Sequence, residues 1–557
     1  MRRQRLLVML AATLVLTSCG GDTGGQAGRG PQIGVIDIAA TPVDTLRDGG
    51  SFRWPLASFP ANFNYNHLDG TYEPTDQMLR SVMPYIFLSQ ADGTVKTDDN
   101  YLTSAELTST NPQVATYTVR DEAIWSDGTP ITWRDFTAQW QALNGSNKDF
   151  RIASSTGYTD IASVERGTSD KQVVVTFARP FSDWQVLFNP LYPAATNTNP
   201  GVFNTGWIQR LPVTAGPYRV EQIDQTAKTI TVVRDEKWWG RKPRLDRIAF
   251  RVIPDEAEFD ALANNEIDFI DIGPDVNQFT RAQGATGVKV HKALAPNYRH
   301  ITFNGNPGSI LADQQLRIAI QKGINSRAIA QAQIGRIVPD PTPLGNHIFV
   351  QGQRGYQDNS QVVGYDPAEA SRMLDALGWT RPATAQDAGT RRKNGRDLVI
   401  RDVIPAQVPV AEQESRQVQQ FLSQIGVKVE ITPVPTDDFF DKHIRPGNFD
   451  MTHFAWIGTA FPISEKGAIY STRGDTQQNF GGIGNETINN LFAEASRELD
   501  PTRKIELANR IDQEIWKTGH SLLFYQRPNV IAVRDGVANF GAFGFADPVY
   551  TDIGFTR

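Results

Sequence analysis

The segment from Phe449 to Ser464 carries residue types that are well suited to holding a ligand through noncovalent contacts. A short β-prone run ends at Trp456 and Ile457, and Gly458 then breaks it, so the run predicts a strand that enters an unusually apolar loop. Aromatic rings in such a loop offer large apolar faces to a ligand. We expect Trp456 and Phe461 to contact the ligand, and burial of both rings in the core is the alternative.

The elements upstream of this loop predict where it lies. Residues 398–403 have a strand pattern, residues 410–425 have a helical pattern closed by Gly426, and residues 427–431 have a second strand pattern. This order favours parallel pairing with a right-handed crossover. Open sheets of this kind bind ligands beyond the carboxyl ends of their strands, so we predict that residues 458–463 face a crevice.

The residue types that metal and redox chemistry need are sparse. The seven histidines never stand three or four positions apart, and the chain has one cysteine, so we predict no metal site and no cofactor. No nucleophile elbow, phosphate-binding loop or dinucleotide fingerprint appears. Carboxylates are plentiful, but nothing singles out a hydrolytic pair. The sequence therefore predicts a protein that is not an enzyme.

The N-terminus has the parts of an export signal. Three arginines precede an apolar run from Leu6 to Leu16, and the run ends in Leu16-Thr17-Ser18-Cys19. This ending resembles the bacterial lipobox, which implies a signal peptide at residues 1–18 and lipidation of Cys19. The pair Arg2-Arg3 leaves Sec and twin-arginine export open. No later run is long enough to span a bilayer, so we expect the lipid to be the only attachment to the membrane.

Charge and length limit the remaining possibilities. Loss of the three signal arginines takes the formal net charge from -6 to -9, which argues against nucleic acid as a partner. With Cys19 as the only cysteine, one molecule cannot form a disulfide. A chain of 557 residues predicts two or three domains. Residues 19–45 are expected to be a flexible tether, because residues 20–34 are rich in glycine.

Several helices are predicted by their own end signals. Asp366, Asn485 and Asp500 each stand as an N-cap before an amphipathic stripe, and Gly378 ends the first of these helices. Residues 316–324 carry a further apolar stripe at helical spacing. We expect these helices to be scaffold.

Longer segments resemble one family along nearly the whole mature chain. The stretch from Thr116 to Trp140 reads as a strand, a turn with W-S-D-G-T-P, and a helix opening near Thr132. V-T-A-G-P-Y-R-V at residues 213–220, L-A-N-N-E-I-D at 262–268 and the strand at 300–304 follow in order. These segments are similar to those of the extracytoplasmic solute-binding proteins of family 5, which feed peptide and nickel ABC importers.

This resemblance implies an α/β, two-lobed periplasmic-binding-protein-like fold of the large peptide-binding class, with a subdomain inserted in lobe one. The chain would cross between the lobes near Tyr298 and near Phe524, which makes these positions the hinge. The implied ranges are 46–299 for lobe one with the insertion near 86–195, 300–524 for lobe two, and 525–557 for a C-terminal segment that completes lobe one.

The resemblance also implies a function. A monomer, anchored by its lipid to the outer face of the bacterial cytoplasmic membrane, would close on an oligopeptide or peptide-like ligand and deliver it to the permease subunits of an ABC importer. A binder of a non-peptide solute and a peptide-sensing receptor are the alternatives. A surface hydrolase is a further one with no motif behind it.

One position departs from the pattern of peptide-binding relatives. Those proteins have G-W-x-x-D on this strand, and the aspartate pairs with the peptide's free amine. Here Thr459 stands at the position of that aspartate, and a hydroxyl cannot supply the charge. Either Asp69 or Glu465 replaces it, or the amine is not held here. The expected cleft residues are Trp456, Thr459, Phe461, Tyr298, Tyr525, Phe63 and Asn64.

Overall fold

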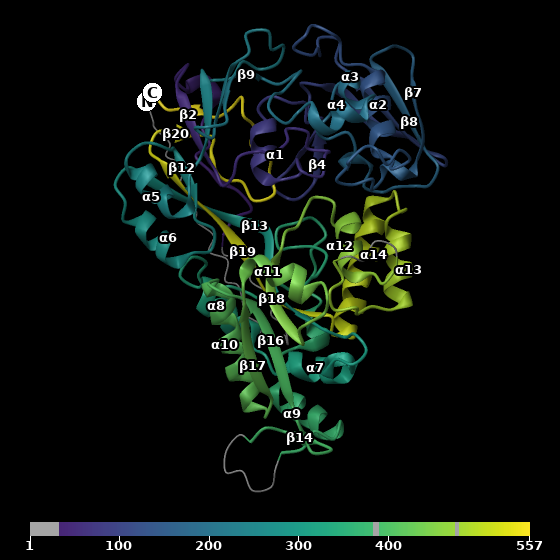
Figure 1. Cartoon of the computed structure of the whole chain (residues 1–557), viewed down its shortest axis with the longest axis vertical. Coiled ribbons are helices and arrows are strands. Elements are labelled where there is room, and N and C mark those ends of the chain that lie inside the picture. Colours follow the sequence, from purple (N-terminus) through teal and green to yellow (C-terminus); the bar gives the residue numbers. More distant parts are fainter. Residues whose placement is uncertain (1–32, 382–388, 474–477) are drawn as a thin grey trace, which may run out of the picture.

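The computed structural model describes residues 33–381, 389–473 and 478–557. The expected signal peptide, the lipidation at Cys19 and the glycine-rich start of the tether lie outside the described residues. Within them, the chain forms a wide part and a narrow part joined by long strands (Figure 1). We keep the division that the family resemblance implies: lobe one denotes residues 33–299 and 525–557, most of the wide part, and lobe two denotes residues 300–524.

Lobe one is built on a four-stranded sheet in the order β2, β11, β10, β9, with β2 and β11 parallel and the other neighbours antiparallel. Alternate residues of β2 point inward, so Phe52 and Trp54 are buried. Trp54 stacks on Tyr550 with 5.4 Å between ring centroids, so the end of the chain packs in this core. The strands are Ser51–Leu56 (β2), Tyr218–Asp224 (β9), Thr229–Arg234 (β10) and Arg247–Val252 (β11).

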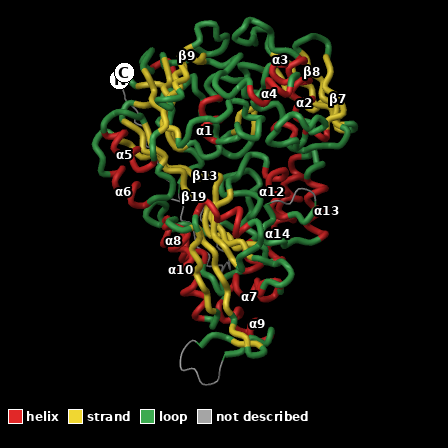
Figure 2. Tube along the Cα trace, in the orientation of Figure 1, coloured by secondary structure: helices red, strands yellow, loops and turns green. Residues whose placement is uncertain are grey.

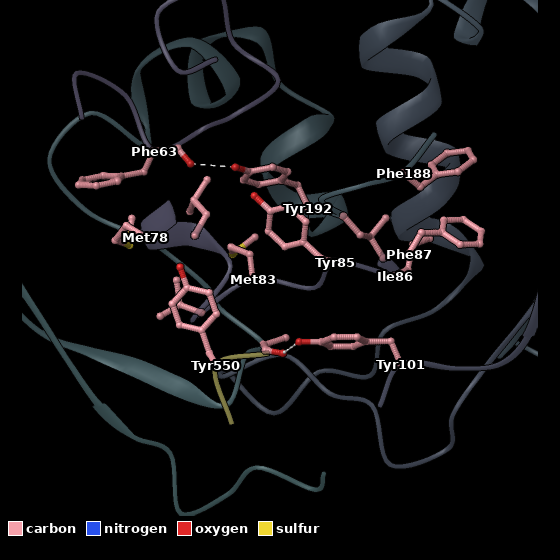
Figure 3. Close-up of a cluster of buried hydrophobic side chains, with 14 of the residues drawn as sticks. Phe63, Met78, Met83, Tyr85, Ile86, Phe87, Tyr101, Phe188, Tyr192 and Tyr550 are labelled. Carbon is pink, nitrogen blue, oxygen red and sulfur yellow. Dashed lines mark hydrogen bonds between the residues drawn. The ribbon is translucent and has the colours of Figure 1, made fainter. Parts of the chain in front are cut away.

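A second antiparallel sheet, in the order β5, β6, β8, β7, forms the subdomain within residues 86–195. Its helix α2 begins after Thr132, where Thr132 and Asp135 form a capping box, as the sequence predicts. Figure 3 shows the core next to it, in which the Tyr192 hydroxyl donates a 2.8 Å hydrogen bond to the Phe63 carbonyl. The elements are Phe87–Ser89 (β3), Val95–Thr97 (β4), Leu102–Thr110 (β5), Gln113–Val119 (β6), Trp133–Leu143 (α2), Ile161–Arg166 (β7) and Gln172–Phe177 (β8), with Glu73–Leu79 (α1), Ala194–Asn197 (α3) and Pro200–Thr205 (α4) beside them.

A six-stranded sheet in the order β12, β19, β13, β18, β16, β17 connects the lobes. Its strands β13 and β19 are long and antiparallel, and Figure 2 shows them running from lobe one into lobe two. Ala293 packs in the core of lobe one, whereas Tyr298 and Ile301 on the same strand pack in the core of lobe two. The strands are Phe269–Asp271 (β12), Val288–Phe303 (β13), Val399–Pro405 (β16), Lys428–Val434 (β17), Met451–Trp456 (β18) and Ser521–Arg534 (β19).

The predicted strand-helix-strand unit is present. β16 and β17 pair in parallel and are connected by α10 (Pro409–Gln424), and β16 pairs in parallel with β18.

The helices α5 (Asp255–Ala263) and α6 (Val276–Gln283) pack in the hydrophobic core of lobe two, although both precede the first crossing strand in the sequence. The core of lobe two therefore continues along β13 and β19 into lobe one.

The predicted helix caps of lobe two are confirmed. The side chains of Asp366, Asn485 and Asp500 accept hydrogen bonds from the backbone N–H groups of Glu369, Ile488 and Arg503. The helices α12, α13 and α14 form a small core of their own beside the sheet. The helices of lobe two, besides α10, are Gln314–Lys322 (α7), Ser326–Ile334 (α8), Pro367–Ala376 (α9), Thr436–Asp438 (α11), Pro462–Tyr470 (α12), Glu486–Ala495 (α13) and Pro501–Thr518 (α14).

The folded body begins earlier than its composition indicates, and this corrects the expected start near residue 46. β1 (Asp37–Ile38) pairs with β21 (Gly541–Ala542), and the Leu294 N–H donates to the Gly34 carbonyl at 2.9 Å. Residues 33–45 are thus fixed to the C-terminal segment. A two-residue strand carries no periodic pattern, which is why the sequence does not reveal it.

Candidate ligand-binding cleft

A cavity of about 650 Å³ lies where the two lobes meet. Lobe one contributes its walls from α1, α5, β12 and α6, and the crossing strands β13 and β19 contribute its back. Lobe two contributes Ala455 and Ile457 from β18 and the residue that follows it. This volume is in the usual range of small-molecule sites, and a junction between lobes is where such sites form.

The walls of this cavity carry an excess of negative charge. Five carboxylates face one guanidinium, that of Arg527: Glu73, Asp255, Glu258, Asp271 and Asp275. Burial, together with the neighbouring negative charges of Asp255 and Asp271, raises the pKa of Glu258 to about 7. Burial also raises the pKa of Asp271 to about 6, with Glu73 adding to the shift and Arg527 opposing it.

Two amide oxygens of the cavity wall lack donors. Gln278 Oε1 and Asn297 Oδ1 are buried, and neither accepts a hydrogen bond within the described parts of the chain. A buried acceptor without a donor costs free energy. Together with the carboxylates, these oxygens make the cavity a set of acceptors that suits a ligand rich in N–H donors.

The strand β18 presents different side chains on its two faces. Ala455 and Ile457 line the cavity, and Ile457 is 66% exposed. Trp456 belongs to the other face of the strand, because successive residues alternate. There it lies between His300 and Phe480, with ring centroids 5.8 and 6.0 Å away and rings within 13° of parallel. The predicted segment thus reaches the cavity, and Ile457 rather than Trp456 lines it.

Tyr298 and Tyr525 are buried at the base of the junction. The Tyr525 hydroxyl donates to Glu414 Oε1 at 2.8 Å, and Arg299 pairs with the same carboxylate at 2.6 Å. Tyr298 lies under the ammonium of Lys466, which is 4.9 Å from its ring centroid. Because both tyrosines are almost wholly buried, they support the strands behind the cavity.

The other expected residues lie in two places, both outside the cavity lining. Phe63 and Asn64 are buried in lobe one, where Asn64 Nδ2 donates to the Phe203 carbonyl at 3.1 Å. Thr459 is exposed, and its hydroxyl accepts from the Phe461 N–H at 3.1 Å, so these two residues form the turn before α12.

The two carboxylates considered as substitutes for the family aspartate are already paired. Asp69 is half-exposed and lies 3.1 Å from Arg151. Glu465 lies 2.7 Å from the buried ammonium of Lys466, and its second oxygen, Oε2, has no hydrogen-bond partner among the residues described. Neither lines the cavity.

Sequence reasoning missed the cavity carboxylates, and one signal could have found part of them. Asp271 ends the short strand β12, and side chains at carboxyl ends of strands are candidates for ligand contact. Glu73 and Glu258 stand on α1 and α5 and have no such signal. Only the folded arrangement brings the three together.

No cluster of three or more potential metal-ligand side chains occurs in residues 33–381, 389–473 and 478–557. The helices in these ranges include none with the length and apolar character to cross a membrane.

The α/β fold with two lobes and a cavity at their junction defines a solute-binding architecture, and the comparisons agree. The model of "Bacterial extracellular solute-binding proteins, family 5 Middle" matches residues 100–479. The oligopeptide-binding protein OppA of Mycobacterium tuberculosis is 44% identical over 99% of this chain and 93% of its own. The chain therefore belongs to family 5 of the bacterial extracellular solute-binding proteins. Because this is a family of binding proteins, the prediction of a non-enzyme is confirmed.

Solved structures share the fold. A periplasmic EDTA-binding protein, EppA, superposes with a TM-score of 0.85 at 24% identity, covering 94% of this chain and 99% of its own. The oligopeptide-binding protein AppA of Bacillus subtilis, in complex with a nonapeptide, gives a TM-score of 0.71 at 17% identity, covering 92% and 100%. These neighbours confirm the predicted two-lobed α/β fold.

Proposed function

We propose that this protein captures oligopeptides in the cavity between its lobes and delivers them to the permease subunits of an ABC importer. The cavity at the lobe junction carries this proposal, because residues of both lobes line it and a ligand there would bridge them. The 44% identity to a protein named for oligopeptide binding supports the choice of ligand class. The protein would act as a monomer without metal, cofactor or nucleic acid.

The ligand's ammonium group would be held by cavity carboxylates in place of the family aspartate. Asp271 and Glu73 interact electrostatically in the cavity wall, and the opposing charge of Arg527 leaves an excess of acid. A charge-assisted hydrogen bond to an ammonium is about twice as strong as a neutral one. Ile457 would then pack on the first apolar side chain of the peptide.

The negative charge of the cavity also favours peptides over polycarboxylates, one class of non-peptide ligand. The neighbour EppA is named for binding EDTA, a polycarboxylate. A polyanion in a cavity with five carboxylates and one arginine would be repelled. The acid-lined wall therefore favours cationic and amine-bearing ligands over anionic ones.

The experiment that tests this function begins with mass spectrometry of whatever co-purifies with the native protein. Calorimetry then compares the free and N-acetylated forms of one identified peptide. We expect acetylation to weaken binding at least about tenfold, equivalent to about 1.4 kcal/mol. Equal affinities would exclude amine recognition by the carboxylates, and cleavage of a peptide pool without retention would exclude the binding function.

We propose that Cys19 is lipidated and anchors the protein to the outer face of the cytoplasmic membrane. The basic head, apolar run and small residues before Cys19 support this. Metabolic labelling with a palmitate analogue should mark the wild-type chain and not Cys19→Ser. The gene neighbourhood tests the transport role, since permease and ATPase genes beside this one favour import over sensing.

A further inference from the structure

The inserted subdomain touches lobe two through a loop with a buried aspartate at its centre. Asp183 is 2% exposed, and its Oδ2 accepts hydrogen bonds from the backbone N–H of Ser464, at 3.0 Å, and from the Ser464 hydroxyl. Its Oδ1 accepts from the ammonium of Lys504. Next to it, the Ser182 N–H donates to the Ser496 carbonyl at 2.8 Å. Ser464 lies in α12, Ser496 directly after α13 and Lys504 in α14, and Figure 1 shows these three helices in lobe two.

The groups of lobe two that contact Asp183 form a binding site for a carboxylate. Ser464 is in the first turn of α12, where backbone N–H groups have no partner within the helix. The residue before this helix, Phe461, has no side chain that could cap it. The carboxylate of Asp183 supplies the missing acceptor from another lobe, and negative charge at a helix N-terminus is favourable. Lys504, from the start of α14, adds an opposite charge.

Lobe one holds the Asp183 loop in place independently of this contact. The Gln113 side chain accepts from the Phe181 N–H at 2.7 Å and donates to the Phe181 carbonyl at 3.1 Å. The ring of Trp184 packs edge-on against Tyr117 in the subdomain core, with centroids 5.8 Å apart. The carboxylate is therefore positioned by one lobe and its binding site by the other.

A second contact joins the lobes nearby. The tip of the β3–β4 hairpin accepts a 2.9 Å hydrogen bond at the Asp92 carbonyl from the Arg354 N–H of lobe two. Gln353 lies against Gly93, where a Cβ would come within 2.7 Å of the Gln353 side chain, and φ is +74°. The side-chain amide of Gln353 donates a hydrogen bond to the Thr459 carbonyl at 3.4 Å. This contact reaches the turn that follows β18.

We propose that Asp183 is a latch that stabilises the closed arrangement of the lobes through Ser464 and Lys504, whatever ligand occupies the cavity. None of the three residues lines the cavity. Their contact shifts the balance between open and closed protein, and the apparent affinity for every ligand scales with the fraction that is closed. Asp183 is thus a positioning residue.

The test measures the distance between the lobes without any ligand, so its outcome does not depend on the proposed function. Because Cys19 is the only cysteine, a full chain with Cys19→Ser accepts spin labels at Ala162→Cys in the subdomain and Ala493→Cys on α13, both exposed positions. We compare Asp183→Asn and Lys504→Met with Asp160→Asn, which removes an ion pair to Arg179 inside the same subdomain.

We expect the ratio of short to long interlabel distances to fall about tenfold in Asp183→Asn and in Lys504→Met, and to stay unchanged in Asp160→Asn. The double variant should lose no more than either single one, because both remove the same contact. Distance distributions in both latch variants that match the control would overturn the proposal. If Asp183→Asn does not fold, Lys504→Met alone decides.

Discussion

Carboxylates occur at two places in the lobe junction, the Asp183 contact and the cavity, and they are neutralised at only one of them. At the Asp183 latch, the carboxylate meets a lysine and a helix N-terminus, so the charge is compensated within the protein. In the cavity, five carboxylates face one arginine, and buried amide oxygens lack donors. The carboxylate of Asp183 is thus paired within the protein, whereas the carboxylates of the cavity outnumber the one arginine that faces them.

The buried pair behind the cavity extends this comparison. Arg299 and Glu414 are both buried, 2.6 Å apart, and Tyr525 donates a further hydrogen bond to Glu414. The three residues join β13, α10 and β19. Compensated charge is therefore also present where β13 and β19 cross between the lobes.

The largest expected effect comes from breaking this buried pair. Arg299→Met leaves Glu414 charged and buried without its partner, and we expect the free energy of unfolding to fall by about 3–5 kcal/mol. Urea unfolding followed by tryptophan fluorescence measures it. Arg416→Met is the matched control, because Arg416 pairs with Glu412 on the exposed face of the same helix. A loss no greater than that of the control would contradict the distinction between the two kinds of charge.

Removing carboxylates from the cavity wall should stabilise the protein, whereas breaking the buried pair should destabilise it. In Glu73→Gln with Asp271→Asn, we expect the free energy of unfolding at pH 8 to rise by up to about 1 kcal/mol, after allowance for solvent screening. Binding of an identified free-amine peptide should weaken at least about tenfold. The control is Asp260→Asn, whose carboxylate pairs with Arg281 outside the cavity. Weaker stability together with unchanged binding would place the ligand elsewhere.

The sequence predicts local features well because their causes are local. The caps at Asp366, Asn485 and Asp500 each act within one helical turn, and the parallel unit of β16 and β17 follows from the order of elements. The family segments then place these elements in a two-lobed fold.

The cavity could not be predicted in the same way. Glu73, Glu258 and Asp271 come from separate elements of the chain, and only the packing of α1, α5 and β12 brings them together. The sequence does not show which side chains of β18 point toward the cavity. Phe454, Trp456 and Ile457 are all apolar, so the alternation along the strand gives no polar face. The sequence therefore predicts a strand that reaches the cavity without showing which of its faces lines it.

The contribution of the cavity carboxylate Glu258 to stability is expected to depend on pH. Its pKa is raised from 4.5 to about 7 in the folded protein, so the protonated form is favoured there. Stability from this group is fully present below pH 4.5 and is lost as the pH rises through about 7. We expect Glu258→Gln to melt close to the wild type at pH 4.5 and at a higher temperature at pH 8.

The measurement is a pair of thermal melts at each pH, since only the difference between variant and wild type isolates Glu258. The same melts with Glu256→Gln, at an exposed position on the same helix, are the control. A melting-temperature difference that stays constant from pH 4.5 to pH 8 would show that Glu258 does not titrate in this range.

The smallest expected effect concerns Thr459, where relatives have the aspartate. The residue is exposed, lies in the turn before α12, and does not line the cavity. In Thr459→Asp, the new carboxylate would be screened by solvent, and an exposed ion pair contributes about 0.2–1 kcal/mol. We expect the affinity for a free-amine peptide to rise by no more than about fivefold in calorimetry, and the acetylated peptide to bind unchanged. An increase of a hundredfold for the free amine would mean that the amine lies at this turn. The carboxylates of the cavity would then serve another part of the ligand.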